Sequence, residues 1–212
     1  MKIPPKKYLV AVLVVILVLV RLTGRIGQEG SPQDRFRVVR VIDGDTIELA
    51  GGDRLRLTAI DCPERNDPYY DEATTFLEQI LTGRRVSVVF GPRRRDHYGR
   101  LLGHIYLDSL WVNRAILERG LGHIYLFDDN LADSVRLAGL LAAQETAMNA
   151  GINIWSLAVT EEPFYLARKG SFRFHRPFCR SVADRPADQL IRFESRREAF
   201  RRGYSPCRNC RP

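Results

Sequence analysis

Two short stretches, "VIDGDTIEL" (residues 41–49) and "RLRLTAIDCPE" (residues 54–64), indicate how this chain folds. Both contain short β-rich runs, and both carry carboxylates next to a turn. The Asp-Gly-Asp of the first stretch is, by itself, typical of a hairpin turn. The second stretch adds Asp61 and Glu64 at the end of a strand that can meet this turn. We therefore expect adjacent strands whose carboxylates gather at one end.

Further strands and three helices extend this pattern. β-Rich runs divided by Gly, Asp and Pro turns lie at residues 35–42, 45–50, 54–60, 84–90 and 101–107. Apolar spacing predicts an amphipathic helix in residues 69–83, with Gly83 as its C-cap, and a shorter helix in residues 111–120. A third helix of about 20 residues has Asn130 as its N-cap and ends at Gly151. This order predicts an α+β fold, a small closed five-stranded β-barrel of the OB type with three helices.

The carboxylates indicate a metal site, and two arginines indicate a bound phosphate. Converging carboxylates repel one another unless a cation lies between them, and oxygen ligands without a nearby cluster of His or Cys thiolates favour Ca²⁺ or Mg²⁺. Arg56 alternates with Leu55 and Leu57 along its strand, so it points away from them, toward the barrel mouth. Arg100 lies at a turn that opens a strand. Taken singly, each arginine is typical of an exposed strand, but beside a cation the two can bind a pentacoordinate phosphate.

Five motifs, in this order, resemble the staphylococcal nuclease (thermonuclease) family. They are "VIDGDTIEL", "RLRLTAIDCPE", "DHYGRLLGHIY", "VNRAILERGLG" and "GINIWS", and they span roughly residues 36–156. The resemblance implies that calcium is bound by the carboxylates of Asp45 and Asp61 and by the backbone carbonyl of Cys62. Cys62 stands where the best-known member has threonine, an exchange that a main-chain ligand should tolerate. We expect the Cys62 side chain to be a small packed residue rather than a reactive thiol.

The same resemblance implies the catalytic roles. Glu64 would orient or deprotonate the attacking water, Arg56 and Arg100 would bind the scissile phosphate, and Tyr98 would contact the nucleotide. It implies a calcium-dependent phosphodiesterase that acts on DNA and RNA, cleaves the P–O5′ bond and leaves 3′-phosphate ends. The alternative is a non-catalytic OB-fold protein that binds nucleic acid at the cell surface, and the presence of the whole catalytic set argues against it. We expect a monomer without a small-molecule cofactor.

The basic charge is unevenly distributed. Residues 35–163 carry 15 basic and 19 acidic residues, a net charge of −4, whereas residues 164–212 carry 13 basic and four acidic residues, a net charge of +9. A nuclease needs basic surface to bind a polyanion. Arg93, Arg94 and Arg95 either steer the nucleic acid strand beside the site or form a solvated hairpin tip.

The N-terminus is a targeting segment. Three lysines precede an unbroken apolar run from Tyr8 to Val20, and Arg21 follows. Such a run is short for a full membrane span and typical of a signal sequence, but no A-x-A-like cleavage site follows it. We favour an uncleaved signal-anchor over residues 1–22, with the N-terminus inside the cell and the rest outside, over a cleaved signal and a secreted protein. Residues 23–34 are a polar linker to a barrel domain over residues 35–160.

The tail, residues 164–212, contains three of the four cysteines. We expect a hairpin around Lys169 and Gly170 and a short helix capped by Ser195 and ended by Gly203. A segment this small needs a staple. A disulfide leaves one tail cysteine over unless Cys62 joins, and a redox pair lacks its usual βαβ context. The favoured staple is zinc, bound by one histidine and three cysteines: His175, Cys179, Cys207 and Cys210.

A second resemblance supports the zinc staple. "FRFHRPFCR" and "SRREAFRRGYSPCRNCRP" are similar to the small zinc module of Ada-type DNA methyl-phosphotriester repair proteins, in which all four ligands are cysteine. His175 stands where that family has the methyl-accepting cysteine, so we infer the fold and the metal but not methyl transfer. The remaining role is binding of nucleic acid through basic residues interleaved with phenylalanines. The phenylalanines are equally suited to form the small core of the module.

Overall fold

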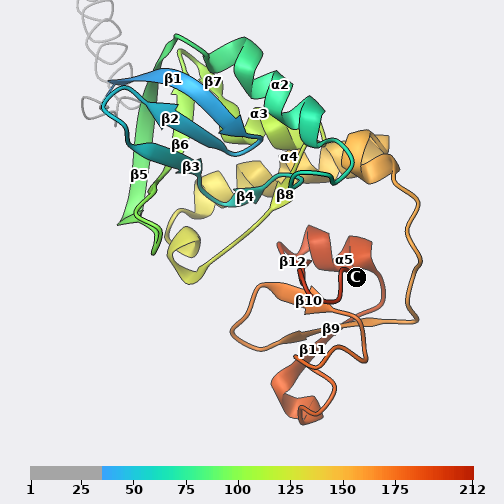
Figure 1. Ribbon diagram of the computed structural model, residues 1–212. Coiled ribbons are helices and arrows are strands. Elements are labelled where there is room, and N and C mark those ends of the chain that lie inside the picture. Colours follow the sequence, from blue (N-terminus) through green and yellow to red (C-terminus); the bar gives the residue numbers. More distant parts are fainter. Residues whose placement is uncertain (1–34) are drawn as a thin grey trace, which may run out of the picture. The chain divides into compact units, whose positions relative to one another are not determined.

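The computed structural model describes residues 35–212, which are coloured in Figure 1. The targeting segment and the linker predicted for residues 1–22 and 23–34 lie outside the described residues. Among residues 35–212, no helix is both long and apolar enough to cross a membrane. The prediction of a signal-anchor therefore stays a prediction.

A sheet that closes on itself forms the first part of the fold. Antiparallel pairing connects five strands in the order β3 (Arg54–Leu57), β2 (Thr46–Leu49), β1 (Arg35–Asp43), β5 (Arg85–Arg95) and β6 (Leu101–Leu107), and β7 (Leu110–Trp111) extends the edge. β3 and β6 pair in parallel, with Leu55 opposite Leu101 and Leu57 opposite Gly103, and this pairing closes the barrel. The predicted five-stranded barrel of OB type is confirmed.

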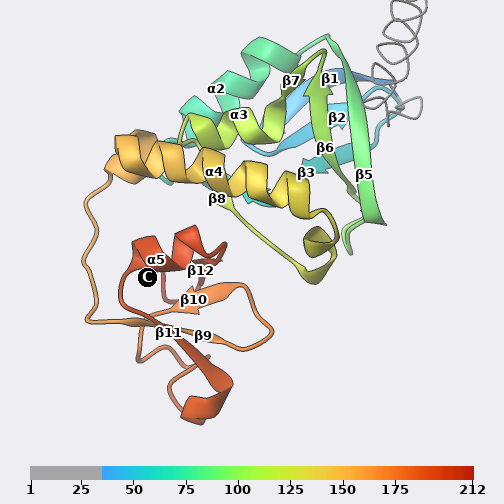
Figure 2. The same ribbon diagram turned by 180° about the vertical axis from the view of Figure 1, so that it is seen from behind.

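Three helices cover the barrel, as expected. They are α2 (Tyr70–Leu81), α3 (Val112–Glu118) and α4 (Ser134–Ala150), and Figure 2 shows α3 and α4 side by side. α2 buries Ala73, Leu77 and Leu81 at i, i+4 and i+8, which is the apolar face that its sequence predicts. Below the helices, β4 (Ile60–Asp61) pairs with β8 (His123–Ile124) and holds Asp61 in a buried position.

The third helix begins later than predicted. Asn130 is not its N-cap but lies in the 3-10 helix η1 (Asp128–Ala132), where its side chain accepts a hydrogen bond from Phe127 N and donates one to Thr58 Oγ1. Asp133 is the N-cap, and its carboxylate accepts a hydrogen bond from Arg136 N at 2.9 Å. Both residues suit a cap, and the contact with Thr58 in the barrel commits Asn130 to the loop. Gly151 ends the helix in the left-handed conformation, as expected.

The tail forms a second, four-stranded sheet. Its order is β11 (Leu190–Phe193), β9 (Tyr165–Arg168), β10 (Arg173–His175) and β12 (Ser205–Pro206), with β10 and β12 parallel. Two 3-10 helices, η2 (Asn153–Ser156) and η3 (Ala187–Gln189), lie before the sheet and within it. The hairpin turns at Gly170, and Ser195 caps α5 (Arg196–Arg201), both as predicted. The sequence indicated neither β11 nor β12.

The tail packs directly against the barrel helices. Met148 of α4 belongs to the same buried cluster as Tyr165, Phe174 and Phe200 of the tail. The buried side chain of Gln144 accepts a hydrogen bond from Ile124 N at 2.8 Å and donates one to the carbonyl of Phe200 at 2.8 Å. Residues 35–212 accordingly belong to one compact unit.

Candidate active site and metal centre

A cavity of about 640 Å³ opens at the mouth of the barrel. Seven residues that the sequence singled out line it together with one from the tail: Asp43, Asp45, Arg56, Cys62, Glu64, Tyr98, Arg100 and Arg208. They come from the β1–β2 turn, from β3, from the loop after β4 and from the β5–β6 turn, while Arg208 follows β12. The fold therefore brings the predicted site residues together from distant parts of the chain.

Asp45 and Asp61 converge on one nitrogen atom of Arg56. Nη2 of Arg56 lies 3.1 Å from Asp45 Oδ2 and 2.5 Å from Asp61 Oδ1. The side chains are almost buried, with 10% of each aspartate and 13% of Arg56 exposed. Arg56 also donates from Nη1 to the carbonyls of Leu57 at 2.9 Å and Ile60 at 2.8 Å. Two buried carboxylates that face one cationic group form a donor set suited to a divalent oxygen-liganded ion.

The electrostatics of Asp45 fit the same ion. Burial raises the pKa of Asp45 from 3.8 to about 7, with Arg56 opposing the rise and Asp43 and Asp61 adding to it. Its carboxylate accepts hydrogen bonds from Thr46 Oγ1 at 3.0 Å and from the backbone N–H of Cys62 at 3.1 Å. The raised pKa means that this carboxyl group binds a proton more tightly than an ordinary one, whereas a divalent cation between these carboxylates would displace the proton and stabilise the ionised form.

Cys62 is a packed residue, as expected. Its Sγ lies 3.0 Å from the carbonyl of Gly44, and burial raises the pKa of the thiol well above 9.0. A Cβ added at Gly44 would lie 2.8 Å from the Cβ atoms of both Cys62 and Ala73. The Asp-Gly-Asp turn therefore needs its glycine because the loop after β4 and helix α2 approach it so closely.

Glu64 is the accessible carboxylate of the cavity. Its side chain is 67% exposed, and Oε1 lies 3.2 Å from Nη2 of Arg208. The backbone N–H of Glu64 donates to Asp67 Oδ2 at 3.3 Å, which holds the loop after Pro63 in a turn. The carboxylate can therefore reach a water molecule in the cavity.

Arg100 is oriented by Asp96, which sequence reasoning missed. Oδ2 of Asp96 accepts from Arg100 Nε at 2.8 Å, and Oδ1 accepts from the backbone N–H groups of Tyr98 and Arg100, each at 2.9 Å. Burial acts to raise the pKa of Asp96, but the hydrogen bonds from Arg100 outweigh it and lower the pKa. The i,i+4 spacing of Asp and Arg across a Gly-containing turn is the signal that would have identified this contact. Tyr98 extends into solvent next to Arg100.

The three arginines before this turn do not line the cavity. Arg93 pairs with Asp129 at 3.4 Å, and the guanidinium of Arg94 lies 4.3 Å from the centre of the Phe90 ring. Arg95 donates to Asp53 at 2.9 Å, and Asp53 does line the cavity. All three lie in the last part of β5, so a role in steering nucleic acid stays a prediction.

Comparison with known proteins identifies the family of the barrel. A family model described as staphylococcal nuclease homologue matches residues 54–157. A thermonuclease of Staphylococcus hyicus is 30% identical over 139 residues, which are 61% of this chain and 80% of that protein. The chain belongs to the staphylococcal nuclease family. The thermonuclease of Staphylococcus intermedius is 29% identical over 160 residues, which are 69% of this chain and 94% of that protein.

A further relative covers the barrel less completely. An uncharacterized endonuclease of Escherichia coli O157:H7 is 39% identical over 93 residues, which are 42% of this chain and 60% of that protein. The match to the family model ends at residue 157, before the tail begins. The resemblance of residues 164–212 to an Ada-type zinc module is not confirmed by these comparisons and stays a prediction.

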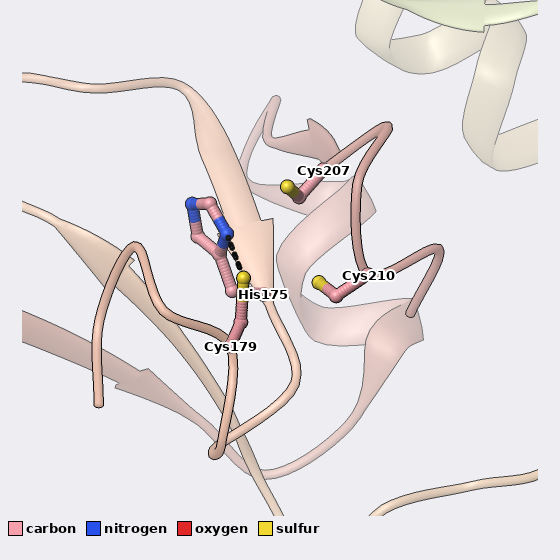
Figure 3. A group of neighbouring side chains, drawn as sticks. All are labelled: His175, Cys179, Cys207 and Cys210. Atoms are coloured by element: carbon pink, nitrogen blue, oxygen red, sulfur yellow. Dashed lines mark hydrogen bonds between the residues drawn. The ribbon is translucent and has the colours of Figure 1, made fainter.

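The tail contains a compact cluster of one histidine and three cysteines. The side chains of His175, Cys179, Cys207 and Cys210 point toward one another (Figure 3), and their ligand atoms lie within 4.8 Å of one another. Sγ of Cys179 lies 3.4 Å from Nδ1 of His175. Tetrahedral zinc with Zn–S and Zn–N distances of about 2.3 and 2.0 Å would separate its ligands by roughly 3.5–3.8 Å. All four cysteines of the chain are free, so the fold does not use a disulfide.

The chemistry of this cluster also fits a metal. Burial, followed by Arg168 and Arg173, lowers the pKa of His175, which keeps the imidazole neutral and able to donate a lone pair. Burial raises the pKa of the Cys210 thiol to about 12. Three thiols this close cannot all ionise without a cation among them, and a zinc ion would supply one.

Proposed function

We propose that this protein is a calcium-dependent nuclease that hydrolyses phosphodiester bonds of DNA and RNA and leaves 3′-phosphate ends. The observation that carries the proposal is the convergence of Asp45 and Asp61 on one nitrogen of Arg56, in a cavity shared with Glu64 and Arg100. The thermonucleases and the endonuclease among its relatives support the same activity.

Individual residues account for metal binding, proton transfer and phosphate binding in this reaction. Asp45, Asp61 and the backbone carbonyl of Cys62 would hold the calcium ion, which supplies positive charge to stabilise the pentacoordinate phosphate. Glu64 takes a proton from the attacking water as the water oxygen bonds to phosphorus, and the P–O5′ bond breaks with its electron pair on O5′, which takes up a proton from solvent. Arg100 is held through Nε by Asp96, so its Nη groups remain able to donate to phosphate oxygens.

Two substitutions test this assignment. Glu64→Gln and Arg100→Ala should each lower the rate of DNA cleavage in calcium by at least ~100-fold, because one removes the base and the other a charge that stabilises the transition state. Glu118→Gln and Arg114→Ala are matched controls, since these two residues form an exposed ion pair 2.7 Å long in α3. The site assignment is wrong if the Glu64 and Arg100 variants cleave DNA like the controls. Protection of DNA by the wild type, instead of cleavage, would favour the binding protein.

The tail has its own proposed role. We propose that zinc bound by His175, Cys179, Cys207 and Cys210 stabilises the module and that the basic module assists nucleic-acid binding. The net charge of +9 over residues 164–212 and the convergent ligand atoms support this. Metal analysis of the purified protein should find one zinc per chain.

We also propose that the protein is a monomer anchored in the membrane by residues 1–22, with the nuclease outside the cytoplasm. The apolar run between lysines and Arg21 supports the anchor. Fractionation of cells that express the full chain tests it, because a cleaved signal would leave the protein shorter and in the medium.

A further inference from the structure

Arg208 of the tail reaches into the cavity of the barrel. Its Nη2 atom lies 3.0 Å from both carboxylate oxygens of Asp61 and 3.2 Å from Oε1 of Glu64. It lines the same cavity as Arg56 and Arg100, although it is 147 residues away from Asp61 in the sequence. The tail thus adds a fourth guanidinium group to a cavity that is also lined by Arg54, Arg56 and Arg100 of the barrel.

The loop that carries Arg208 belongs to the cluster of His175, Cys179, Cys207 and Cys210. The residue lies in the Cys-x2-Cys loop, between Cys207 and Cys210. The backbone N–H of Cys207 donates to the carbonyl of Phe174 at 2.9 Å, and that of Arg211 donates to the carbonyl of Cys207 at 2.9 Å. A metal bound by both cysteines would fix both ends of this loop, and so would hold the start of the Arg208 side chain toward the cavity.

Arg56 is enclosed by groups of the barrel. Its two Nη atoms carry four hydrogens, and they contact four oxygen atoms, in the carboxylates of Asp45 and Asp61 and the carbonyls of Leu57 and Ile60. Only 13% of its side chain is exposed. The donors of Arg56 are therefore largely engaged by groups of the barrel in this structure.

Arg208 differs from Arg56 in both respects. Its side chain is 58% exposed, and its contacts with Asp61 and Glu64 all use Nη2, so they do not occupy the donors on Nη1 and Nε. A guanidinium with free donors is well suited to phosphate oxygens, which it can bind in bidentate fashion. The charge distribution also favours phosphate binding by the tail, because residues 35–163 carry a net charge of −4 and residues 164–212 a net charge of +9.

We propose that Arg208 is a substrate-binding residue of the nuclease site, which the metal cluster of the tail presents to a backbone phosphate of the nucleic acid strand on the Glu64 side of the cavity. The inference deepens the proposed function and rests on it for the identity of the substrate. In this proposal the tail contributes a side chain to the active site and also provides a separate basic surface.

Binding of a fluorescein-labelled octathymidylate to the zinc-loaded protein, without added calcium, tests the proposal apart from catalysis. Arg208→Ala should weaken the affinity about 5- to 20-fold and lower the slope of log affinity against log salt by about 0.7, the value for one phosphate contact to a single strand. Arg208→Lys should recover part of the affinity but not all of it. With calcium, Arg208→Ala should raise KM by a similar factor and change kcat less than about threefold.

Arg192→Ala is the matched control. Arg192 belongs to the same module, is about half exposed, pairs with Glu194 at 2.9 Å and does not line the cavity. The Arg192→Ala variant loses one positive charge, as Arg208→Ala does, and its affinity for the oligonucleotide should change less than twofold. Cys210→Ala should weaken binding at least as much as Arg208→Ala, since the loss of one ligand of the cluster would release the loop that carries Arg208.

Four results would overturn the proposal: unchanged affinity in Arg208→Ala, an equal loss in Arg192→Ala, full affinity in Cys210→Ala, or tighter binding in Arg208→Ala. The last would show that Arg208 competes with the nucleic acid for the carboxylates. These outcomes are separate from failure of the proposed function. A wild-type protein that binds the oligonucleotide through Arg208 but does not cleave DNA would refute the nuclease alone, and one that cleaves without depending on Arg208 would refute this inference alone.

Discussion

The barrel and the tail differ in the interactions that can stabilise them. The barrel buries a continuous aliphatic core, to which Ile47, Leu55 and Leu57 contribute side chains with no exposed surface. The tail has a small aromatic cluster around Phe174 and a separate cluster of two cysteines and Val182. A segment of this size buries too little apolar surface to fold firmly by itself. From this difference we expect that the barrel depends on packing and that the tail depends on a metal ion bound by its Cys and His cluster.

Removal of zinc should have the largest effect, and on the tail alone. Cys207→Ser takes away one of four ligands, and structural zinc contributes about 10–16 kcal/mol to the folding of comparable small modules. We expect residues 164–212 to lose protection from hydrogen exchange while the barrel keeps it, with zinc content falling in parallel. Cys62→Ala is the control, because Cys62 lies in the barrel and contacts Gly44 instead of the cluster. Full zinc content and full protection in Cys207→Ser would contradict the comparison.

A cavity in the barrel should have the next largest effect. Leu57 of β3 has no exposed surface, and Leu57→Ala should lower the free energy of unfolding by about 2–5 kcal/mol through lost burial and an unfilled cavity. Denaturation by urea measures the change. Val135→Ala, at a side chain that is 81% exposed in α4, should change it by less than about 0.5 kcal/mol. A loss below about 1 kcal/mol in Leu57→Ala would mean that the barrel does not depend on packing here.

Acid should weaken the barrel through His104. Burial lowers the pKa of His104 from 6.5 to about 4, with Arg136 adding to the effect and Asp133 opposing it. The imidazole therefore stays neutral in the folded barrel, whereas the unfolded chain binds a proton below pH ~6.5. Stability is fully present above that pH and falls by up to about 3 kcal/mol as the pH drops to 4.

His104→Phe removes this titration and keeps an aromatic ring beside Trp111, whose ring centre lies 5.4 Å from that of His104. The difference in unfolding free energy between wild type and variant should therefore depend on pH between about 4 and 6.5 and be constant above this range. Acid would also compete with a zinc ion for the cluster in the tail, but that effect would be common to both proteins and would cancel in the difference. A difference that does not depend on pH would exclude His104.

The sequence predicted the residues that lie close to a turn and missed those that depend on tertiary contact. The turns at Gly44 and Gly99 bring Asp45 and Arg100 to the cavity, so local pattern sufficed for them. Arg208 reaches Asp61 only because Gln144 and the aromatic cluster fix the tail against α4 and β8. No local pattern carries this information.

The same distinction explains why the sequence did not indicate β12 and why the N-cap of α4 was predicted wrongly. β12 is two residues long and pairs in parallel with β10, which no alternation of residues could indicate. The N-cap at Asn130 was wrong because two residues near the start of the helix suit a cap equally well, and a contact with Thr58 in the barrel decides between them. The residues of the Cys and His cluster were predicted because their short spacings are local, although their meeting in one cluster is not.

Helix caps provide the smallest and sharpest test of the comparison. Ser195→Ala should remove about 1 kcal/mol from the tail and Asp133→Ala about the same from the barrel, since each side chain accepts a hydrogen bond from a first-turn N–H, of Glu198 at 3.1 Å and of Arg136 at 2.9 Å. Ser195→Thr and Asp133→Asn keep the acceptor and should restore most of the loss. Hydrogen exchange, followed separately in the two regions, measures each effect. If Ser195→Ala weakens protection in the barrel as much as in the tail, the two regions unfold as one unit. The contacts through Gln144 and Arg208 would then couple the two regions more strongly than their different means of stabilisation separate them.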